Sequence, residues 1–335
     1  MTTADPDTEH DEPESLCVFA PSPLLTVTVE HDVHEHDQLH VHVGGQGLWI
    51  ARMVRTLGMR PQLCAVFGGE TGQVARFLAE LEELDVRSIR TEAWNGGYVH
   101  DRRGGDRVEL VDVPPSPLSR HELDELYSIT MAAALSAGTC ILAGSHVKEV
   151  IPDDVYGRLA TDLRSAGVEV IADLSGGSLR AVLEGGPSLV KVSDEELERD
   201  GWADSNEQDD VLDGIARLQE SGARDVVVSR GAETTLASIH GLLFAVGAPK
   251  VVVVDGRGGG DSMTAALGVA SARAMPTIDG LRLAAASAAA SIVRRGLATG
   301  ARDVIEAMAP LVDVTAVDAT TRDAISDDRA GRFGS

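Results

Sequence analysis

One segment in the last third of the chain combines a glycine cluster with carboxylates. The sequence VVVVDGRGGGDSMTAALGVA (251–270) places an apolar run and the glycines just before Asp261 and a helical pattern. Gly258, Gly259 and Gly260 let backbone N–H groups approach a ligand closely, and a helix N-terminus adds further unpaired donors. Such a segment is suited to binding an anion such as a phosphate.

Two roles are open to Asp261 on the local sequence. At the start of a helix, its carboxylate would cap the free N–H groups. Beside a bound phosphate, it would instead act as a general base that takes a proton from an attacking hydroxyl. The segment lacks the lysine of a P-loop and the acidic partner of a dinucleotide-binding unit, so neither motif explains it.

The charge of the chain limits its partners. The 335 residues carry a formal net charge of −24. This acidity argues against a nucleic-acid surface and against binding to anionic membranes, because both require basic residues. The sequence also lacks a long uncharged apolar run and the pattern of a signal peptide. We therefore expect a cytoplasmic protein that binds small molecules, with no nucleic-acid or membrane partner.

Strand and helix patterns alternate along the chain. This alternation predicts βαβ units and a mainly parallel sheet, whose ligands bind at the carboxyl ends of the strands. We expect residues 1–16 to form a disordered acidic tail and residues 318–335 a flexible C-terminal tail, around one domain at 17–317. The predicted strands are 62–67, 139–143, 168–172, 188–192, 225–229 and 251–254, and the predicted helices include 119–136, 153–166, 208–221, 261–274 and 279–295.

Two polar segments interrupt this alternation. Residues 26–43 alternate strictly between apolar and polar types, and residues 97–112 resemble a hairpin that turns at Gly104–Gly105. Both are too polar for the core of a parallel sheet. They predict a small separate sheet that serves as a lid or as a dimer contact.

Four histidines share one parity within the first polar segment. On a continuous strand, His34, His36, His40 and His42 would line a single face. Three interpretations remain open: a metal site, a pH-sensitive dimer contact, and a plain polar face.

Several segments, in the right order, resemble signatures of the ribokinase/PfkB carbohydrate kinases. DGRGGGDSMTAALG (255–268) resembles the motif D-T-x-G-A-G-D-S-F, and GGQGLWIA (44–51) resembles G-G-K-G-x-N-x-A. ADLSGGSL (172–179) is similar to a motif of the 1-phosphofructokinase and tagatose-6-phosphate kinase branch. The resemblance covers about residues 17–310. It implies a ribokinase-like three-layer α/β sandwich with a mainly parallel sheet, plus a small β-sheet lid. Further matches are FGGETG (67–72), KVSDEEL (191–197), VVVSRGAE (226–233) and SIVRRGLATG (291–300).

The resemblance implies phosphoryl transfer from ATP to a hydroxyl, with Mg²⁺ as a cofactor. Asp261 would be the base, and the backbone of residues 258–261 would form the anion hole. Lys191 and Glu196 have an alternative role as solvent-facing charges, and Ser229 as an ordinary turn residue. The nucleotide-side candidates are Lys191, Ser229, Gly231, Asp255, Gly258 and Gly260, and the candidate metal ligand is Glu196.

The acceptor side departs from the family pattern. Trp49 stands where the family has an asparagine, Thr26 where it has an aspartate, and Trp94 where it has an arginine. Flat tryptophan faces suit the stacking of a sugar ring or a base, unless both side chains only fill core space. The substrate-binding candidates are Thr26, Gly44, Gly45, Gln46, Trp49, Trp94, Asn95 and Asp261.

Three arginines of the second polar segment add another possibility. One of Arg102, Arg103 and Arg107 would replace the lost phosphate-binding arginine, unless all three are solvated turn charges. We expect a PfkB-type kinase that acts on a sugar or sugar-like alcohol and forms a homodimer through the lid sheet. The alternatives are a nucleoside kinase of the same family and a catalytically silent relative that binds a sugar or nucleotide.

Overall fold

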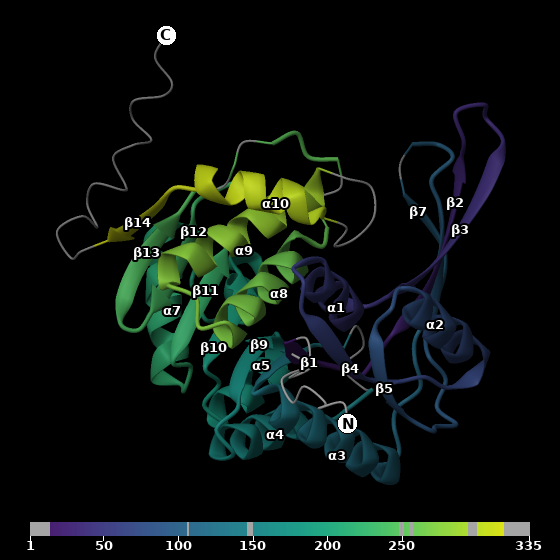
Figure 1. The fold of residues 1–335 in the computed structure, drawn as a ribbon, viewed down its shortest axis with the longest axis horizontal. Coiled ribbons are helices and arrows are strands. Elements are labelled where there is room, and N and C mark those ends of the chain that lie inside the picture. The colour runs from purple at the N-terminus through teal and green to yellow at the C-terminus, as the bar shows by residue number, and fades with distance from the viewer. Residues whose placement is uncertain are drawn as a thin grey trace, which may run out of the picture.

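A central sheet runs through the part of the chain that the computed structural model describes, which is residues 14–105, 107–145, 150–247, 249, 251–254, 257–293 and 300–317 (Figure 1). Its strands are β1 (Ser15–Ala20), β4 (Arg60–Val66), β5 (Asp85–Ile89), β8 (Thr139–Ala143), β9 (Glu169–Asp173), β10 (Leu189–Ser193), β11 (Asp225–Ser229), β12 (Thr235–Ile239), β13 (Leu242–Val246) and β14 (Val314–Val317). They lie in the order β14-β13-β12-β11-β10-β9-β8-β1-β4-β5. Neighbours from β11 to β5 pair in parallel, and β11 to β14 pair antiparallel.

Helices cover both faces of this sheet. Successive residues of β1 alternate between two apolar cores, with Leu16 and Val18 in one core and Cys17 and Phe19 in the other. The first core is completed by α1, α2, α8, α9 and α10, and the second by α3, α4, α5, α6 and α7. The predicted three-layer α/β architecture is confirmed. The helices are α1 (Gln46–Thr56), α2 (Gly69–Leu81), α3 (Arg120–Ala137), α4 (Asp154–Ser165), α5 (Gly176–Glu184), α6 (Asp194–Arg199), α7 (Gln208–Glu220), α8 (Gly259–Ala272), α9 (Thr277–Ile292) and α10 (Arg302–Met308), followed by a 3₁₀ turn at Ala309–Leu311.

Two sequence predictions are wrong, one about a strand and one about the extent of the N-terminal tail. Residues 251–254 form no strand, and Val252 is 83% exposed. A hairpin that the sequence patterns did not predict, β12–β13, takes the place next to β11, and Val254 donates its N–H to the carbonyl of Ile292 instead. Ser15 and Leu16 belong to β1, where they pair with β4, and are not part of a disordered tail. Glu14 is also described and forms an ion pair with Arg273 (2.8 Å), while the remaining residues of the two predicted tails, 1–13 and 318–335, lie outside the described residues.

A second, smaller sheet forms the predicted lid. Its strands are β2 (Leu24–His31), β3 (Asp37–Gly44), β6 (Gly97–Asp101) and β7 (Val108–Val113), in the order β3-β2-β6-β7. In Figure 1 its hairpins extend from the body on the right. Alternation makes the lid amphipathic. Thr26, Tyr98 and His42 lie in register on one face, and the valines and leucines between such polar residues lie on the other.

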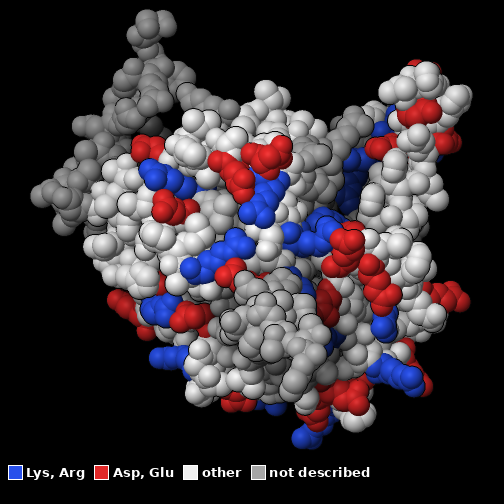
Figure 2. Space-filling model, in the orientation of Figure 1, with Lys and Arg blue, Asp and Glu red and all other residues white. Residues whose placement is uncertain are grey.

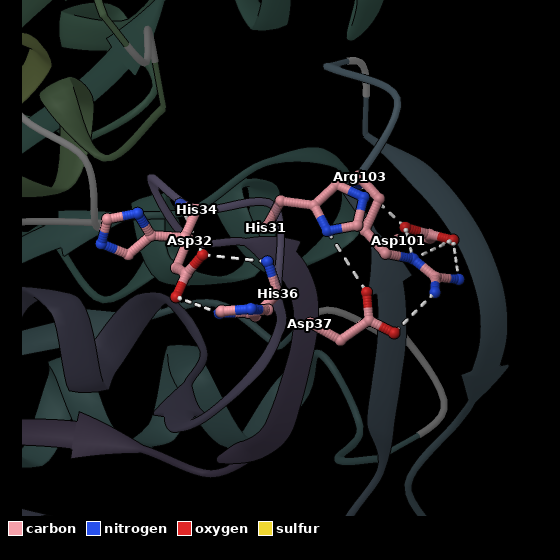
Figure 3. A network of polar contacts seen from close by, with 7 residues as sticks. All are labelled: His31, Asp32, His34, His36, Asp37, Asp101 and Arg103. Atoms are coloured by element: carbon pink, nitrogen blue, oxygen red, sulfur yellow. Dashed lines mark hydrogen bonds and ion pairs between the residues drawn. The ribbon is translucent and has the colours of Figure 1, made fainter.

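The histidine face is shorter than the sequence predicts, because residues 32–36 form a turn (Figure 3). The carboxylate of Asp32 accepts hydrogen bonds from the N–H groups of His34 (2.7 Å) and His36 (2.9 Å), which end the strand. His34 and His36 therefore leave the face that His40 and His42 keep. Among the described residues, no group of three or more His, Cys, Asp or Glu side chains is arranged to hold a metal ion.

The surface of the body carries both signs of charge. Figure 2 shows acidic and basic side chains interspersed on the face it presents. Within the described segments, no helix is both long enough and apolar enough to cross a membrane.

Candidate active site

A cavity of about 560 Å³ lies between the body and the lid. The body contributes residues at the carboxyl ends of β8, β9 and β10, together with the N-terminal ends of α1 and α8. This is the edge at which parallel sheets bind their ligands. The body residues used below are Gln46, Trp49, Asp173, Glu196 and Asp261.

The glycine cluster forms the N-terminus of α8. Gly258 is its N-cap and adopts a left-handed conformation (φ 78°), which favours glycine. The helix begins at Gly259, so Asp261 is its third residue rather than its first. The N-cap is a glycine and therefore has no side chain that could cap this N-terminus, and Asp261 lines the cavity. The local geometry therefore favours a role in the cavity for Asp261 over a capping role.

A buried ion pair lies beneath the glycines. Asp173, at the end of β9, is 3% exposed, and Lys191, on β10, is 5% exposed, with 3.6 Å between the ammonium and the carboxylate. The hydroxyl of Thr264 donates a hydrogen bond to Asp173. A Cβ added to Gly260 would lie only 2.6 Å from Nζ of Lys191. The ammonium thus lies directly against the backbone at the start of α8, where the sequence analysis predicts an anion site.

The pKa of Asp261 is raised to about 7. Burial is the main cause, followed by the nearby carboxylate of Asp173, while the ammonium of Lys191 opposes both. Burial would lower the pKa of Lys191, but the carboxylates of Asp173, Glu196 and Asp261 outweigh it and raise that pKa. A carboxylate with a pKa near neutrality beside a fixed ammonium is suited to accept a proton at physiological pH.

Glu196 is held in place by a capping box. Its Oε2 accepts hydrogen bonds from the backbone N–H and the hydroxyl of Ser193 (both 3.0 Å), and the Ser193 hydroxyl accepts one from the N–H of Glu196 (3.2 Å). Glu196 nonetheless lines the cavity. The Glu196 side chain therefore both forms the capping box and lines the cavity. Mg²⁺ keeps several waters and uses one or two protein carboxylates together with substrate phosphates, so a single glutamate fits that ion.

The structure brings some of the predicted acceptor residues together. Gly45, Gln46 and Trp49, at the start of α1, line the cavity beside Asp261. Oε1 of Gln46 accepts a hydrogen bond from the N–H of Gly144 (2.6 Å), which fixes the side chain over the end of β8.

The other predicted acceptor residues do not line the cavity. Asn95 uses its side chain within the protein, accepting from the N–H of Gly68 (2.7 Å) and donating to two backbone carbonyls (2.9 Å each). Trp94 is 54% exposed and packs on Gly69. Thr26 faces Gly44 at the base of the lid, where a Cβ on that glycine would lie 2.9 Å from the threonine hydroxyl.

The nucleotide-side candidates lie on the next strands of the sheet. Ser229 ends β11 and is in register with Ser193 at the end of β10, close to the Glu196 capping box. Gly231 follows in a left-handed turn (φ 56°) with open space around it. Asp255 lies outside the described residues.

Comparison with known proteins decides the family. The model of the pfkB family of carbohydrate kinases matches residues 21–303. The protein belongs to this family. It is 24% identical over 274 residues to a 1-phosphofructokinase of Bacillus subtilis, covering 81% of this chain and 88% of that one. It is 29% identical over 266 residues to an ATP-dependent 6-phosphofructokinase isozyme 2 of Mycobacterium tuberculosis, covering 78% of each chain.

The fold of this kinase is shared with solved structures. Phosphofructokinase-2 from Escherichia coli, in complex with fructose-6-phosphate, superimposes with a TM-score of 0.76 at 23% identity, covering 89% of this chain and 98% of that one. The ribokinase-like fold class and the assignment as a carbohydrate kinase are therefore confirmed, and the family implies ATP as the phosphoryl donor.

The sequence analysis of this kinase missed two sets of cavity residues. Asp173 carried a usable signal, because it follows a predicted buried strand, where parallel sheets place ligand-binding residues. The lid residues carried only the alternation of β6 and β7, which does not say which face meets the body. That second set consists of Tyr98, His100, Glu109 and Asp112, whereas Arg107, which also lines the cavity, is one of the three arginines that the sequence analysis offered.

Proposed function

We propose that this kinase transfers the γ-phosphoryl group of ATP to a hydroxyl of a small sugar or sugar-like acceptor. Asp261 is the general base, and the backbone N–H groups of residues 258–261 form the anion hole. The observation that carries this proposal is the placement of Asp261: it lies in the cavity in the first turn of α8, after a glycine N-cap, with a pKa of about 7.

Each side of the site has a separate task. The start of α8 and the Lys191 ammonium stabilise the charge that spreads over the transferred phosphoryl oxygens. Gln46 and Trp49 hold the acceptor so that one hydroxyl faces Asp261, which takes its proton as the oxygen attacks. Ser229 and Gly231 support the nucleotide. Bound Mg²⁺, held by Glu196, would neutralise charge on the nucleotide phosphates.

The Asp261→Asn variant tests the base assignment. The amide keeps the size of the side chain but accepts no proton, so kcat falls by roughly 10²- to 10⁴-fold. Calorimetry with ATP and Mg²⁺ should show unchanged binding. Asp279→Asn is the matched control, because Asp279 also lies in the first turn of a helix but outside the cavity. Wild-type turnover by Asp261→Asn would rule out the base assignment.

We also propose that a second copy of this chain covers the apolar face of the lid. Leu39 (66% exposed) and Val41 on β3, and Val111 and Val113 on β7, leave that face open to solvent. Apolar patches of this kind mark association surfaces. Val41→Glu should convert a dimer into a monomer in sedimentation analysis, whereas Val252→Glu, at an exposed residue outside the lid strands, should not. A monomeric wild-type protein would contradict the proposal.

A further inference from the structure

The lid supplies one arginine to the cavity in a fixed position. Arg107 lines the cavity and is half-buried. Its guanidinium lies 5.2 Å from the centre of the Tyr98 ring, and its Nε donates a hydrogen bond to Nδ1 of His100 (2.7 Å). Tyr98 and His100 stack edge to face with their ring centres 4.5 Å apart. Two aromatic rings on the polar face of β6 thus hold one cation.

His100 holds Arg107 as a neutral group. A guanidinium has only donors, so the contacted imidazole nitrogen must be an acceptor. Nη2 of Arg107 also approaches Nε2, but a neutral imidazole has one acceptor nitrogen, so only one of these contacts is the hydrogen bond. Burial, together with Arg107 and Arg102, lowers the pKa of His100, which is 6% exposed. The imidazole therefore orients the arginine without adding charge.

A second arginine of the same hairpin shows the contrast. Arg103 is ion-paired to Asp101 (2.8 Å) and to Asp37 (3.1 Å) at the lid tip, as Figure 3 shows. Among the described residues, Arg107 has no carboxylate partner within ion-pair distance. The positive charge of Arg103 is matched by protein carboxylates. That of Arg107 faces the cavity and is available to a ligand.

We propose that Arg107 binds an anionic group of the acceptor, a phosphate or a carboxylate, and that His100 and Tyr98 are positioning residues for it. This inference rests on the proposed function, since it defines the acceptor class of the same site. A planar guanidinium held in one orientation matches both groups through paired hydrogen bonds. Position 94, where the family has an arginine, holds a tryptophan that lies outside the cavity, whereas Arg107, one of the three arginines that the sequence analysis offered in its place, lines the cavity.

The remaining charges of the cavity limit where the anion lies. Glu109 and Asp112 of β7 are exposed, so water screens their repulsion. Asp173, Glu196 and Asp261 line the opposite, body side, as does Arg257, which directly precedes the N-cap of α8. An acceptor that extends from Asp261 to Arg107 keeps its anionic group at the lid and its reacting hydroxyl at the base.

The test compares three acceptors by the rate of ADP formation: fructose 6-phosphate, gluconate and fructose, which carry a phosphate, a carboxylate and no charge. We expect the wild type to use one of the two anionic compounds with the lowest KM, and that compound identifies the group. Arg107→Gln should raise this KM by about 10- to 100-fold, leaving the KM for ATP unchanged. Arg103→Gln, the matched control on the same hairpin, should leave both values unchanged.

Two substitutions of His100 test whether it positions Arg107. His100→Leu removes the acceptor atom and should raise the KM for the anionic acceptor by about 3- to 10-fold, with kcat nearly unchanged. His100→Asn places an amide oxygen close to the position of Nδ1 and should restore most of that loss. A role limited to lid stability would not distinguish these two variants by their KM.

Three results would overturn the proposal. The first is an unchanged KM for the anionic acceptors in Arg107→Gln. The second is a lower KM for fructose than for both charged compounds. The third applies if no acceptor yields ADP, so that the proposed function itself fails. It is a calorimetric result in which the wild type and Arg107→Gln bind fructose 6-phosphate and gluconate equally, or in which neither protein binds them. Binding to the wild type that Arg107→Gln loses would support the anion site even then.

Discussion

The two sides of the cavity differ in how their charges are held. On the body side, Asp173 and Lys191 are almost fully buried and paired, beneath a helix N-terminus built from glycine. On the lid side, the carboxylates are exposed and Arg107 is held by uncharged rings. Burial fixes the groups to which we assign the chemistry, whereas the lid presents exposed groups that can change without disturbing the core. In the proposed function, the first side carries out the reaction, and the second binds the anionic group of the acceptor.

Breaking the buried pair should have the largest effect. Lys191→Met leaves the carboxylate of Asp173 buried without its partner, and we expect the free energy of unfolding to fall by about 3–5 kcal/mol. Urea denaturation measures this. The double variant Lys191→Met/Asp173→Asn removes the unpaired charge and should recover part of the loss. If the double variant is no more stable than the single one, the ion pair is not the cause.

The second-largest effect should come from adding a methyl group at Gly260, at the start of α8. In Gly260→Ala, the added Cβ would lie 2.6 Å from Nζ of Lys191, so the ammonium or the start of α8 must move. We expect kcat to fall by roughly 10²-fold, because misplacement by about 1 Å has that effect on positioned groups. Gly104→Ala in the lid turn, where the Cβ meets nothing within 4 Å, is the control and should retain wild-type kcat.

The two sides should also differ in their response to pH. Asp261 has a pKa of about 7 and must be deprotonated to act as a base, so kcat/KM for the acceptor should rise with pH up to about 7 and level off above it. Below that value, each pH unit should cost up to tenfold. Asp101 on the lid, whose pKa the Arg103 hydrogen bond lowers to about 2, stays ionised throughout. A flat profile between pH 5 and 8 would contradict the environment described for Asp261.

The smallest effect should come from the ion pairs at the lid tip. Arg103→Gln removes the contacts to Asp101 and Asp37, but all three side chains are solvated, and exposed pairs contribute little. We expect the unfolding midpoint in urea and the kcat to match those of the wild type within error. A clear loss of stability would show that the lid tip is more tightly coupled to the body than its exposure indicates.

The parts of the fold that depend on local patterns were predictable. Residues 139–143 and 225–229 are strands with the expected bounds, because short apolar runs between helices are buried in a parallel sheet. Residues 251–254 show the same apolar character, yet they form no strand, because β12 occupies the place beside β11. Pairing depends on which strands compete for an edge, and a local pattern contains no such information.

The candidate site likewise has residues that the local sequence predicts and residues that only tertiary packing places there. The glycines mark Asp261 through local backbone requirements, so the segment itself points to the anion site. Asn95 was expected at the acceptor, but its partners come from distant parts of the chain: Pro23, Val66 and Gly68. Arg107 and His100 enter the cavity only because the lid turns its polar face toward the body, and this orientation depends on tertiary packing.

Gly45 links the lid to the body of the protein. It is the only residue between the end of β3 and the start of α1, and it adopts a left-handed conformation (φ 103°) with the carbonyl of Ser22 close by. The lid strand and the helix that carries Gln46 and Trp49 therefore share one backbone joint. Any change in the direction of β3 relative to the body would therefore change the backbone directly beside Gln46.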